Sequence, residues 1–332
     1  MDPLTAGVVA VVVLALLFAL TNGFHDTANA IATSVATRAL TPAIAVRMAA
    51  VANLVGAFLG IDIALRVGQD IVALPPGSGG LSVLVAALVA AISWNVLTWW
   101  MGMPTSSTHA LIGGLLGAAV VGEGQVLWGT FGAMVVLPLL ISPLVGFGLA
   151  YVVLLAVLWW CRRMRPDRVE RAFRVMQTGS ATALALGHGL QDAPKAMAVV
   201  VLGLGAAGMA DGSSVPLWVA VACAVAMSLG TAMGGWRIVR TLGAGLVRLD
   251  APRGFAAEST AAVVLYLGGL AFSAPLSTTH TIASALAGVG VTRGWRGVRW
   301  RIALDVVAAW LLTVPATAAL AALVVLALGA AG

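Results

Sequence analysis

Two acidic motifs of the same pattern lie about half the chain apart. Residues 22–32 read NGFHDTANAIA and residues 188–198 read HGLQDAPKAMA. At an offset of 166 residues, Asp26 of the first motif coincides with Asp192 of the second. An aspartate inside an apolar segment is costly unless it is paired or hydrated, so such residues are functional by default. We therefore expect the two carboxylates to bind a monovalent cation or to exchange a proton.

Three polar residues in each motif share one face of a helix by i,i+4 and i,i+3 spacing. They are Asn22, Asp26 and Asn29 in the first motif and His188, Asp192 and Lys195 in the second. These two faces can close on one cavity that holds the coupling cation. His25 precedes Asp26, and because an imidazole titrates near neutral pH, this pair favours protons over sodium. A structural role for His25 stays open as the alternative.

A second repeated pair of motifs is rich in hydroxyl groups. Residues 104–117 read PTSSTHALIGGLLG, and residues 275–288, 171 positions later, read PLSTTHTIASALAG. Each turn precedes an apolar helical stretch, and a helix N-terminus presents free N–H groups that can hold an oxyanion. The predicted anion ligands here are Ser106, Ser107, Thr108, Ser277, Thr278 and Thr279, and the histidines expected beside the substrate are His109, His188 and His280.

The composition places most of the chain in lipid. The residues AVILMFWYC make up 61% of 332 positions, and charged residues only 9%. No soluble domain covers its surface with that balance. Repeated halves with polar interruptions at matching positions predict an all-α polytopic membrane protein with broken helices and two re-entrant hairpins. We expect breaks at residues 22–29, at residues 188–195 and at Pro138 and Pro143, with hairpin tips at MPTSSTH and SAPLSTTH.

The positions of the basic residues predict the orientation. With the N-terminus outside, the arginine-rich loops fall on the cytoplasmic side, as the positive-inside rule requires. Of the 18 Lys and Arg residues, only Arg66 then lies outside and only Lys195 within a span. Both termini are extracellular on this path, and the two copies are inverted relative to each other. The predicted units are membrane repeat 1 at 1–161, a cytoplasmic basic linker at 162–176, and inverted repeat 2 at 177–332.

At these motifs the chain resembles the inorganic phosphate transporter family. NGFHDTANAIAT, HGLQDAPKAM, GGWRIVRTLG and PLSTTH all correspond to family motifs, and the resemblance extends from about residue 5 to 328. It implies symport of phosphate with a cation, with Asp26, Asn29, Asp192, Lys195 and the two hydroxyl turns in the site. The family's second motif usually reads HGxNDAQK, so Gln191 and Pro194 are departures beside Asp192. His25 is similar to the proton-coupled bacterial branch, whose substrate can be a metal-phosphate complex.

The expected function is secondary active import of inorganic phosphate by alternating access, with protons as the coupling cation. Gln191 and Lys195 join the hydroxyls as predicted phosphate ligands. Two alternatives stay open: a sulfate permease on the same scaffold, and an intramembrane metalloenzyme, which the absence of an HExxH spacing disfavours. The expected partners are phosphate, a coupling cation (proton or sodium) and the lipid bilayer, with a homo-oligomer open; no enzyme activity, cofactor, resident metal or nucleic acid is expected.

Overall fold

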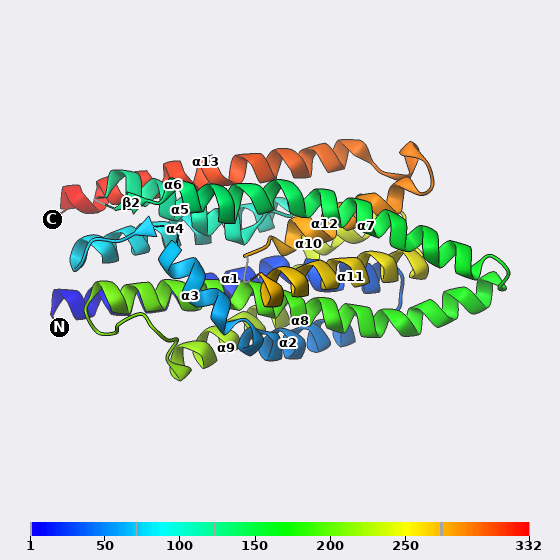
Figure 1. The fold of residues 1–332 in the computed structure, drawn as a ribbon, viewed down its shortest axis with the longest axis horizontal. Helices are drawn as coiled ribbons and strands as arrows, with labels where there is room; N and C mark the ends of the chain where they lie inside the picture. Colours follow the sequence, from blue (N-terminus) through cyan, green and yellow to red (C-terminus); the bar gives the residue numbers. More distant parts are fainter. Residues whose placement is uncertain (1, 71, 123, 273–274, 332) are drawn as a thin grey trace.

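The protein is a bundle of long helices in the computed structural model, which describes residues 2–70, 72–122, 124–272 and 275–331 (Figure 1). In chain order the elements are α1 (Pro3–Ala36), α2 (Pro42–Leu59), α3 (Ile61–Asp70), β1 (Val72–Ala73), α4 (Ser78–Met101), α5 (Ser107–Val121), β2 (Gln125–Val126), α6 (Trp128–Phe131), η1 (Gly132–Val136), α7 (Leu137–Cys161), α8 (Pro166–Ala206), α9 (Leu217–Met233), α10 (Trp236–Arg240), η2 (Thr241–Gly245), α11 (Ala251–Tyr266), η3 (Leu267–Ala271), α12 (Thr278–Val291), η4 (Trp295–Gly297) and α13 (Trp300–Ala331). Ser273, Ala274 and the side chain of Arg66 lie outside the described residues.

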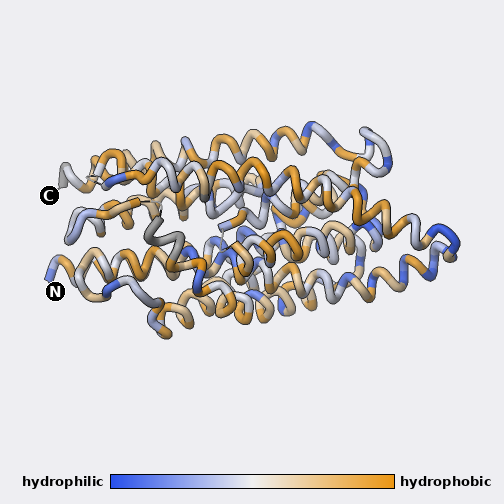
Figure 2. The backbone as a smooth tube through the Cα atoms, in the orientation of Figure 1, coloured by the Kyte–Doolittle hydropathy of each residue, from blue (hydrophilic) through white to orange (hydrophobic). Residues whose placement is uncertain are grey.

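The described helices confirm an all-α membrane protein. Six of them are long and apolar enough to cross a bilayer, and a seventh span results if the bent pair Leu217–Met233 and Trp236–Gly245 counts as one. Apolar residues run along the length of the bundle, and hydrophilic ones gather at the tip between α7 and α8 (Figure 2). The only described sheet is the two-residue antiparallel pair of β1 and β2. Lipid is therefore the solvent of the long helix faces.

The two acidic motifs lie on unbroken helices, so the breaks predicted there are wrong. α1 runs for 34 residues through the first motif, and α8 runs for 41 residues through the second. The physical reason lies in the side chains. Asp26, Asn29, Asp192 and Lys195 are buried, and each has a hydrogen-bond partner on one of the hairpins, so none of them needs a break in its own helix. A polar side chain that finds a partner across the bundle leaves its helical backbone intact.

Pro194 is accommodated inside α8 by a glycine on another helix. A proline removes the hydrogen bond to the carbonyl four residues earlier, here that of Leu190. Gly60, which ends α2, packs against that carbonyl so closely that a Cβ at this position would lie 2.0 Å from the Leu190 oxygen. The proline is thus a departure in sequence that leaves the helix continuous.

Broken and irregular helices occur elsewhere in the bundle. α9 and α10 bend by 56° across Gly234 and Gly235, and Gly234 has a φ of +73°, which glycine adopts without strain. π-helical turns are present at η1, directly before Pro138 at the start of α7, and at η2 and η3. The structure thus has broken helices, as predicted, but not within the acidic motifs. The break predicted at Pro143 is also wrong, because α7 continues through this residue.

Two helical hairpins enter the bundle from opposite ends and meet inside it (Figure 1). Hairpin 1 consists of α4, the turn at 102–106 and α5. Hairpin 2 consists of α11 with η3, a turn of which residues 272 and 275–277 are described, and α12. The returning arms are short, with 15 residues in α5 and 14 in α12. The incoming arms are longer, since α4 has 24 residues and α11 with η3 has 21.

The two copies interleave through glycines at equivalent positions. A Cβ on Gly23 of α1 would lie 2.2 Å from the Met227 carbonyl oxygen of α9, and one on Gly189 of α8 would lie 2.3 Å from the Asn53 oxygen of α2. A Cβ on Gly230 of α9 would likewise lie 2.1 Å from the Leu20 carbonyl oxygen of α1, and one on Gly56 of α2 would lie 2.1 Å from the Leu186 carbonyl oxygen of α8. Each long helix therefore packs backbone to backbone on a helix of the other copy.

The chain termini lie at one end of the bundle and the α7–α8 tip projects at the other (Figure 1). Most of the segment predicted as a linker is helical, because α8 begins at Pro166. α1 and α8 run in opposite directions, and so do α5 and α12. This arrangement is the one that an inverted repeat requires.

Candidate functional site

The hairpin turns present two helix N-termini in the interior. Ser106 caps α5 by accepting a hydrogen bond from the His109 N–H (3.3 Å), and Ser277 caps α12 by accepting one from the His280 N–H (3.2 Å). Both serines are buried, and neither hydroxyl has an acceptor among the described hydrogen bonds. The first N–H groups of each helix have no intrahelical partner. Two hydroxyl donors and two sets of amide donors are thus available for an anion.

Each acidic motif is joined to the hairpin of its own copy. The Ser107 hydroxyl donates to Asp26 Oδ2 (3.0 Å), and the Thr278 hydroxyl donates to Asp192 Oδ2 (3.1 Å). These two contacts are equivalent under the two offsets of the repeat, 166 and 171 residues. The repeat thus places the same hydroxyl–carboxylate contact in each half, at two hydroxyls predicted from the sequence to bind the anion.

Each acidic motif is also joined to the hairpin of the other copy. The Asn29 side-chain amide donates to Thr279 Oγ1 (2.9 Å) and lies 3.4 Å from Thr278 Oγ1. At the equivalent place in the other half, the Lys195 ammonium donates to Thr108 Oγ1. Thr279 in turn donates to the carbonyl of Thr105 in the turn of hairpin 1, at 3.1 Å. Motifs that are 250 residues apart thus close one polar centre.

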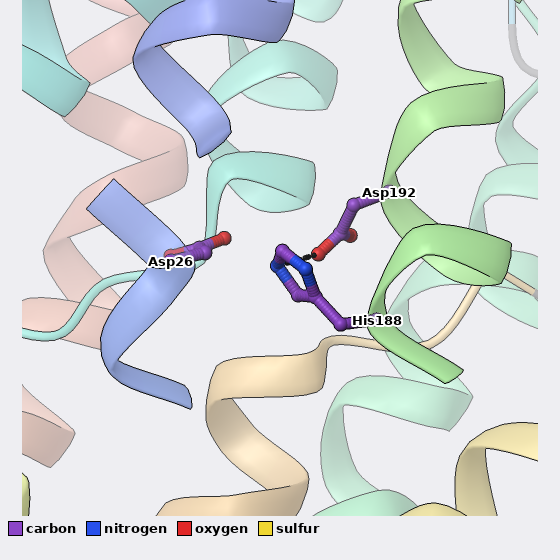
Figure 3. A group of neighbouring side chains, drawn as sticks. All are labelled: Asp26, His188 and Asp192. Atoms are coloured by element: carbon purple, nitrogen blue, oxygen red, sulfur yellow. Dashed lines mark ion pairs between the residues drawn. The ribbon is translucent and has the colours of Figure 1, made fainter. Parts of the chain in front are cut away.

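Two carboxylates and an imidazole meet at this centre (Figure 3). His188 extends from α8 toward Asp26, and one ligand atom each from Asp26, His188 and Asp192 lie within 4.8 Å of one another. His188 Nε2 is 2.8 Å from Asp192 Oδ2 but without the alignment of a hydrogen bond, while its Nδ1 is 3.1 Å from Asn53 Oδ1. The Lys195 ammonium pairs with Asp192, and all these side chains are at most 2% exposed.

The charges of the centre leave an excess of negative charge. Before an extra proton binds, with both His25 and His188 neutral, Asp26 and Asp192 carry two negative charges and Lys195 one positive charge. A buried group of charges is tolerated where it is paired and hydrogen-bonded. The ligand atoms of Asp26, His188 and Asp192 are arranged as in a cation site. The Lys195 ammonium, however, already pairs with Asp192 at this place. An anion that enters this centre therefore needs additional positive charge.

His25 and Gln191 occupy equivalent positions and contact the hairpins. His25 Nδ1 is 2.6 Å from Asp26 Oδ1, and its Nε2 is 3.0 Å from the hydroxyl of Thr98 in hairpin 1. The Gln191 amide donates to the Leu265 carbonyl (3.0 Å) and accepts from the Leu276 N–H (3.1 Å) of hairpin 2. Both polar ends of Gln191 are thus used by the backbone, so we assign it a positioning role rather than direct contact with substrate.

His109 and His280 stack on each other where the two hairpins meet. Their ring centroids are 4.8 Å apart, and His280 also lies 4.0 Å from the ring of Trp310. Trp310 donates to the carbonyl of Pro104 in the turn of hairpin 1 (3.0 Å). The two histidines therefore lie at the interface of the hairpins, each directly after the hydroxyl residues of its own hairpin in sequence.

One of the predicted residues lacks a hydrogen-bond partner for its side chain in the described part of the chain, and one buried carboxylate was not singled out by the motifs. Asn22 is buried on the predicted face, but its amide has no partner among the described residues. Glu258 of α11 is fully buried and accepts from Gln177 (3.1 Å), Ser180 (2.5 Å) and Thr33. This carboxylate lies at the edge of an apolar segment, and its charge inside a span was the signal that could have identified it.

The bundle, the paired hairpins and the buried polar centre define a membrane transporter. Residues 22–321 match the model of the phosphate transporter family. Proteins described as probable low-affinity inorganic phosphate transporters are 44% identical over 309 residues in Mycobacterium tuberculosis strain H37Rv (92% of this chain, 73% of the relative), 43% over 329 in Rhizobium meliloti (97% and 95%) and 38% over 325 in Bacillus subtilis (97% of each).

The chain belongs to the phosphate transporter family, and it is a transporter rather than an enzyme. A solved structure described as the sodium-dependent phosphate transporter superposes on the fold with a TM-score of 0.87 and 24% sequence identity, covering 98% of this chain and 99% of the other. This likeness shows that the arrangement of helices is that of the family fold.

Proposed function

We propose that the protein is a secondary active symporter that imports inorganic phosphate together with protons by alternating access. The observation that supports this most is the charge of the buried centre, where two carboxylates face one ammonium. A phosphate anion would add further negative charge to a low-dielectric site, which is unfavourable without a compensating cation. Binding a proton with the anion lowers that cost, so the two must enter together.

The anion site lies between the two helix N-termini in this proposal. The hydroxyls of Ser106 and Ser277 and the first N–H groups of α5 and α12 supply neutral donors, and Lys195 supplies the positive charge. A tetrahedral oxyanion is held well by several donors of this kind. Neutral hydrogen bonds of modest strength also let the substrate leave, which transport requires.

Proton exchange belongs to Asp26 and His25 on one side and to Asp192 with His188 on the other. Asn29 and Thr279 link the two halves, so that a change at one carboxylate reaches the opposite hairpin. The contacts at equivalent positions and the opposed directions of α1 and α8 support an inverted repeat of residues 1–161 and 177–332. We place the end that carries both termini outside the cell and the arginine-rich α7–α8 tip in the cytoplasm.

Competition in proteoliposomes tests the substrate. Uptake of labelled phosphate under an inward proton gradient should be suppressed by excess unlabelled phosphate and unaffected by equimolar sulfate. Uptake that persists after chelation of divalent cations identifies free phosphate as the substrate, and uptake that requires them identifies metal-phosphate. Preferential transport of labelled sulfate would contradict the proposal and favour a sulfate permease.

A further inference from the structure

Positions 25 and 191 have the same place in the two copies, and each anchors the hairpin of its own half. His25 contacts Thr98 in the incoming arm of hairpin 1 and Thr105 in its turn. Gln191 contacts Leu265 in the incoming arm of hairpin 2 and Leu276 in its turn. We call these the His25 anchor and the Gln191 anchor. The geometry is alike, but the chemistry differs, since an imidazole titrates and an amide does not.

The Gln191 anchor is complete in a single protonation state. Its Nε2 donates to the Leu265 carbonyl, and its Oε1 accepts from the Leu276 N–H. Both partners are backbone groups whose roles as acceptor and donor are fixed. The hydrogen bonds that hold hairpin 2 at this point are therefore independent of pH.

The His25 anchor requires a hydrogen atom on Nε2. The Thr98 hydroxyl donates its one hydrogen to the Trp94 carbonyl (2.8 Å) and accepts a hydrogen bond from the Thr105 hydroxyl (3.0 Å). Its remaining lone pair faces His25 Nε2 at 3.0 Å. If Nε2 carried no hydrogen, its lone pair would face the lone pair of the Thr98 oxygen, and no hydrogen bond could form. The alternative hydrogen bond, from the Thr105 hydroxyl to Nε2, is longer, at 3.4 Å.

A second hydrogen lies on the other side of the ring. His25 Nδ1 and Asp26 Oδ1 are 2.6 Å apart, and a contact of that length needs a proton between the two atoms, on either one. The pair of His25 and Asp26 thus holds two protons and is electrically neutral. If one proton leaves, either this contact or the contact to Thr98 loses its hydrogen bond.

We infer that His25 is a positioning residue that holds hairpin 1 in place only while the His25–Asp26 pair is loaded with its extra proton, whereas Gln191 holds hairpin 2 permanently. Loss of the proton loosens the turn of hairpin 1, to which Asp26 is also joined through Ser107. Hairpin 1 enters from the end that carries both termini, so its release opens the centre toward that end. This inference rests on the proposed proton coupling for its role in transport.

The charged surroundings of His25 are confined to a few groups among the described residues. On its own helix it faces Asp26, and α8 contributes His188, Asp192 and Lys195 beyond Asp26. α4 and the turn of hairpin 1 present only hydroxyls to the ring. Arg237 of α10 lies over Trp99 and bonds the carbonyl of Trp100, on the outer side of α4. The loss of the proton that releases hairpin 1 is therefore assigned to the His25–Asp26 pair.

Hydrogen exchange of the two turns, measured by mass spectrometry on the full-length protein without phosphate, tests this inference. Protection is compared for residues 103–110 and 275–282 at about pH 6 and about pH 8.5, on either side of the range in which an imidazole titrates. After correction for the intrinsic exchange rate, we expect protection of 103–110 to fall roughly 2- to 12-fold at the higher pH, as the loss of one hydrogen bond implies. Protection of 275–282 should not change.

Two variants separate this role from a general effect of pH on the fold. His25→Gln places a permanent amide at the first anchor, so the pH response of residues 103–110 should disappear. Gln191→Glu introduces a titratable group at the second anchor, so residues 275–282 should acquire a response. A response of equal size in both turns of the wild type, or one that persists in His25→Gln, would overturn the inference. Because the experiment uses neither substrate nor a gradient, its failure is distinguishable from a failure of proton-driven uptake.

Discussion

The two halves of the molecule share one geometry but differ in chemistry at equivalent positions of the acidic motifs. Ser107 and Thr278 bond the equivalent aspartates in the same way, and Asn29 and Lys195 reach the opposite hairpins in the same way. Yet Lys195 brings a positive charge where the first half has a neutral amide. The repeat therefore fixes where groups lie, while single substitutions decide which half carries charge.

The second difference concerns the anchors of the hairpins. The first half has the imidazole of His25 at this position, and the second half has the amide of Gln191. The imidazole thus lies where the first hairpin is anchored, while the second half has the positive charge of Lys195. In the mechanism proposed above, the difference between the anchors means that loss of a proton releases hairpin 1, while hairpin 2 is unaffected by pH.

Neutralising either aspartate should have the largest effect on function. Asp26→Asn and Asp192→Asn are each expected to abolish coupled phosphate uptake, because each removes a charge that exchanges the driving cation. Uptake into proteoliposomes is measured at equal amounts of folded protein. Asp305→Asn, an exposed aspartate of α13, is the matched control and should retain uptake. Near wild-type uptake in both test variants would show that the two carboxylates are structural.

Removing the hydroxyls of one turn should weaken binding without unfolding the protein. A neutral hydrogen bond contributes about 0.5–1.5 kcal/mol, so replacing Ser277, Thr278 and Thr279 by alanine should raise the half-saturation concentration for phosphate by roughly one to three decades. The same replacement of Ser106, Ser107 and Thr108 tests whether both halves contribute. An unchanged half-saturation concentration in both variants would place the anion elsewhere.

Replacing a glycine at the contact between the two halves should lower the stability of the protein by a similar amount in either copy. In Gly56→Ala and Gly230→Ala the new methyl group would lie 2.1 Å from a backbone oxygen, so the helices must separate. We expect a loss of stability of about 1–3 kcal/mol, as for other overpacked sites, seen as a lower melting temperature in detergent. Gly148→Ala in α7 is the control, because no heavy atom lies within 4 Å of its added Cβ. Equal melting of all three variants would contradict the packing described.

Much of the centre could be predicted from the repeated motifs. The offset between the copies placed Asp26 and Asp192 in equivalent positions, and the capping role of Ser106 and Ser277 follows from their place before apolar helices. The continuity of α1 and α8 could not be predicted in this way. Polar residues in a span indicate either a break or a partner, and the partner of Asn29 is Thr279, 250 residues away.

Other features depend on which helices become neighbours. The use of Gln191 as an anchor required the position of Leu276, and the tolerance of Pro194 required Gly60 of α2 beside it. Glu258 was missed because it stands at the margin of an apolar run, where a carboxylate resembles an interfacial residue. Its three hydrogen-bond donors come from α1 and α8, far from it in sequence.

The identity of the coupling ion is the most direct test of the whole account. Purified protein in proteoliposomes is given an inward proton gradient without sodium or, in a parallel sample, an inward sodium gradient at equal pH on both sides. We predict that the proton gradient drives accumulation of labelled phosphate, that an uncoupler abolishes it, and that the sodium gradient alone has no effect. Accumulation driven by sodium alone, with no response to the proton gradient or the uncoupler, would contradict the assignment of His25 and Asp26 as the proton site.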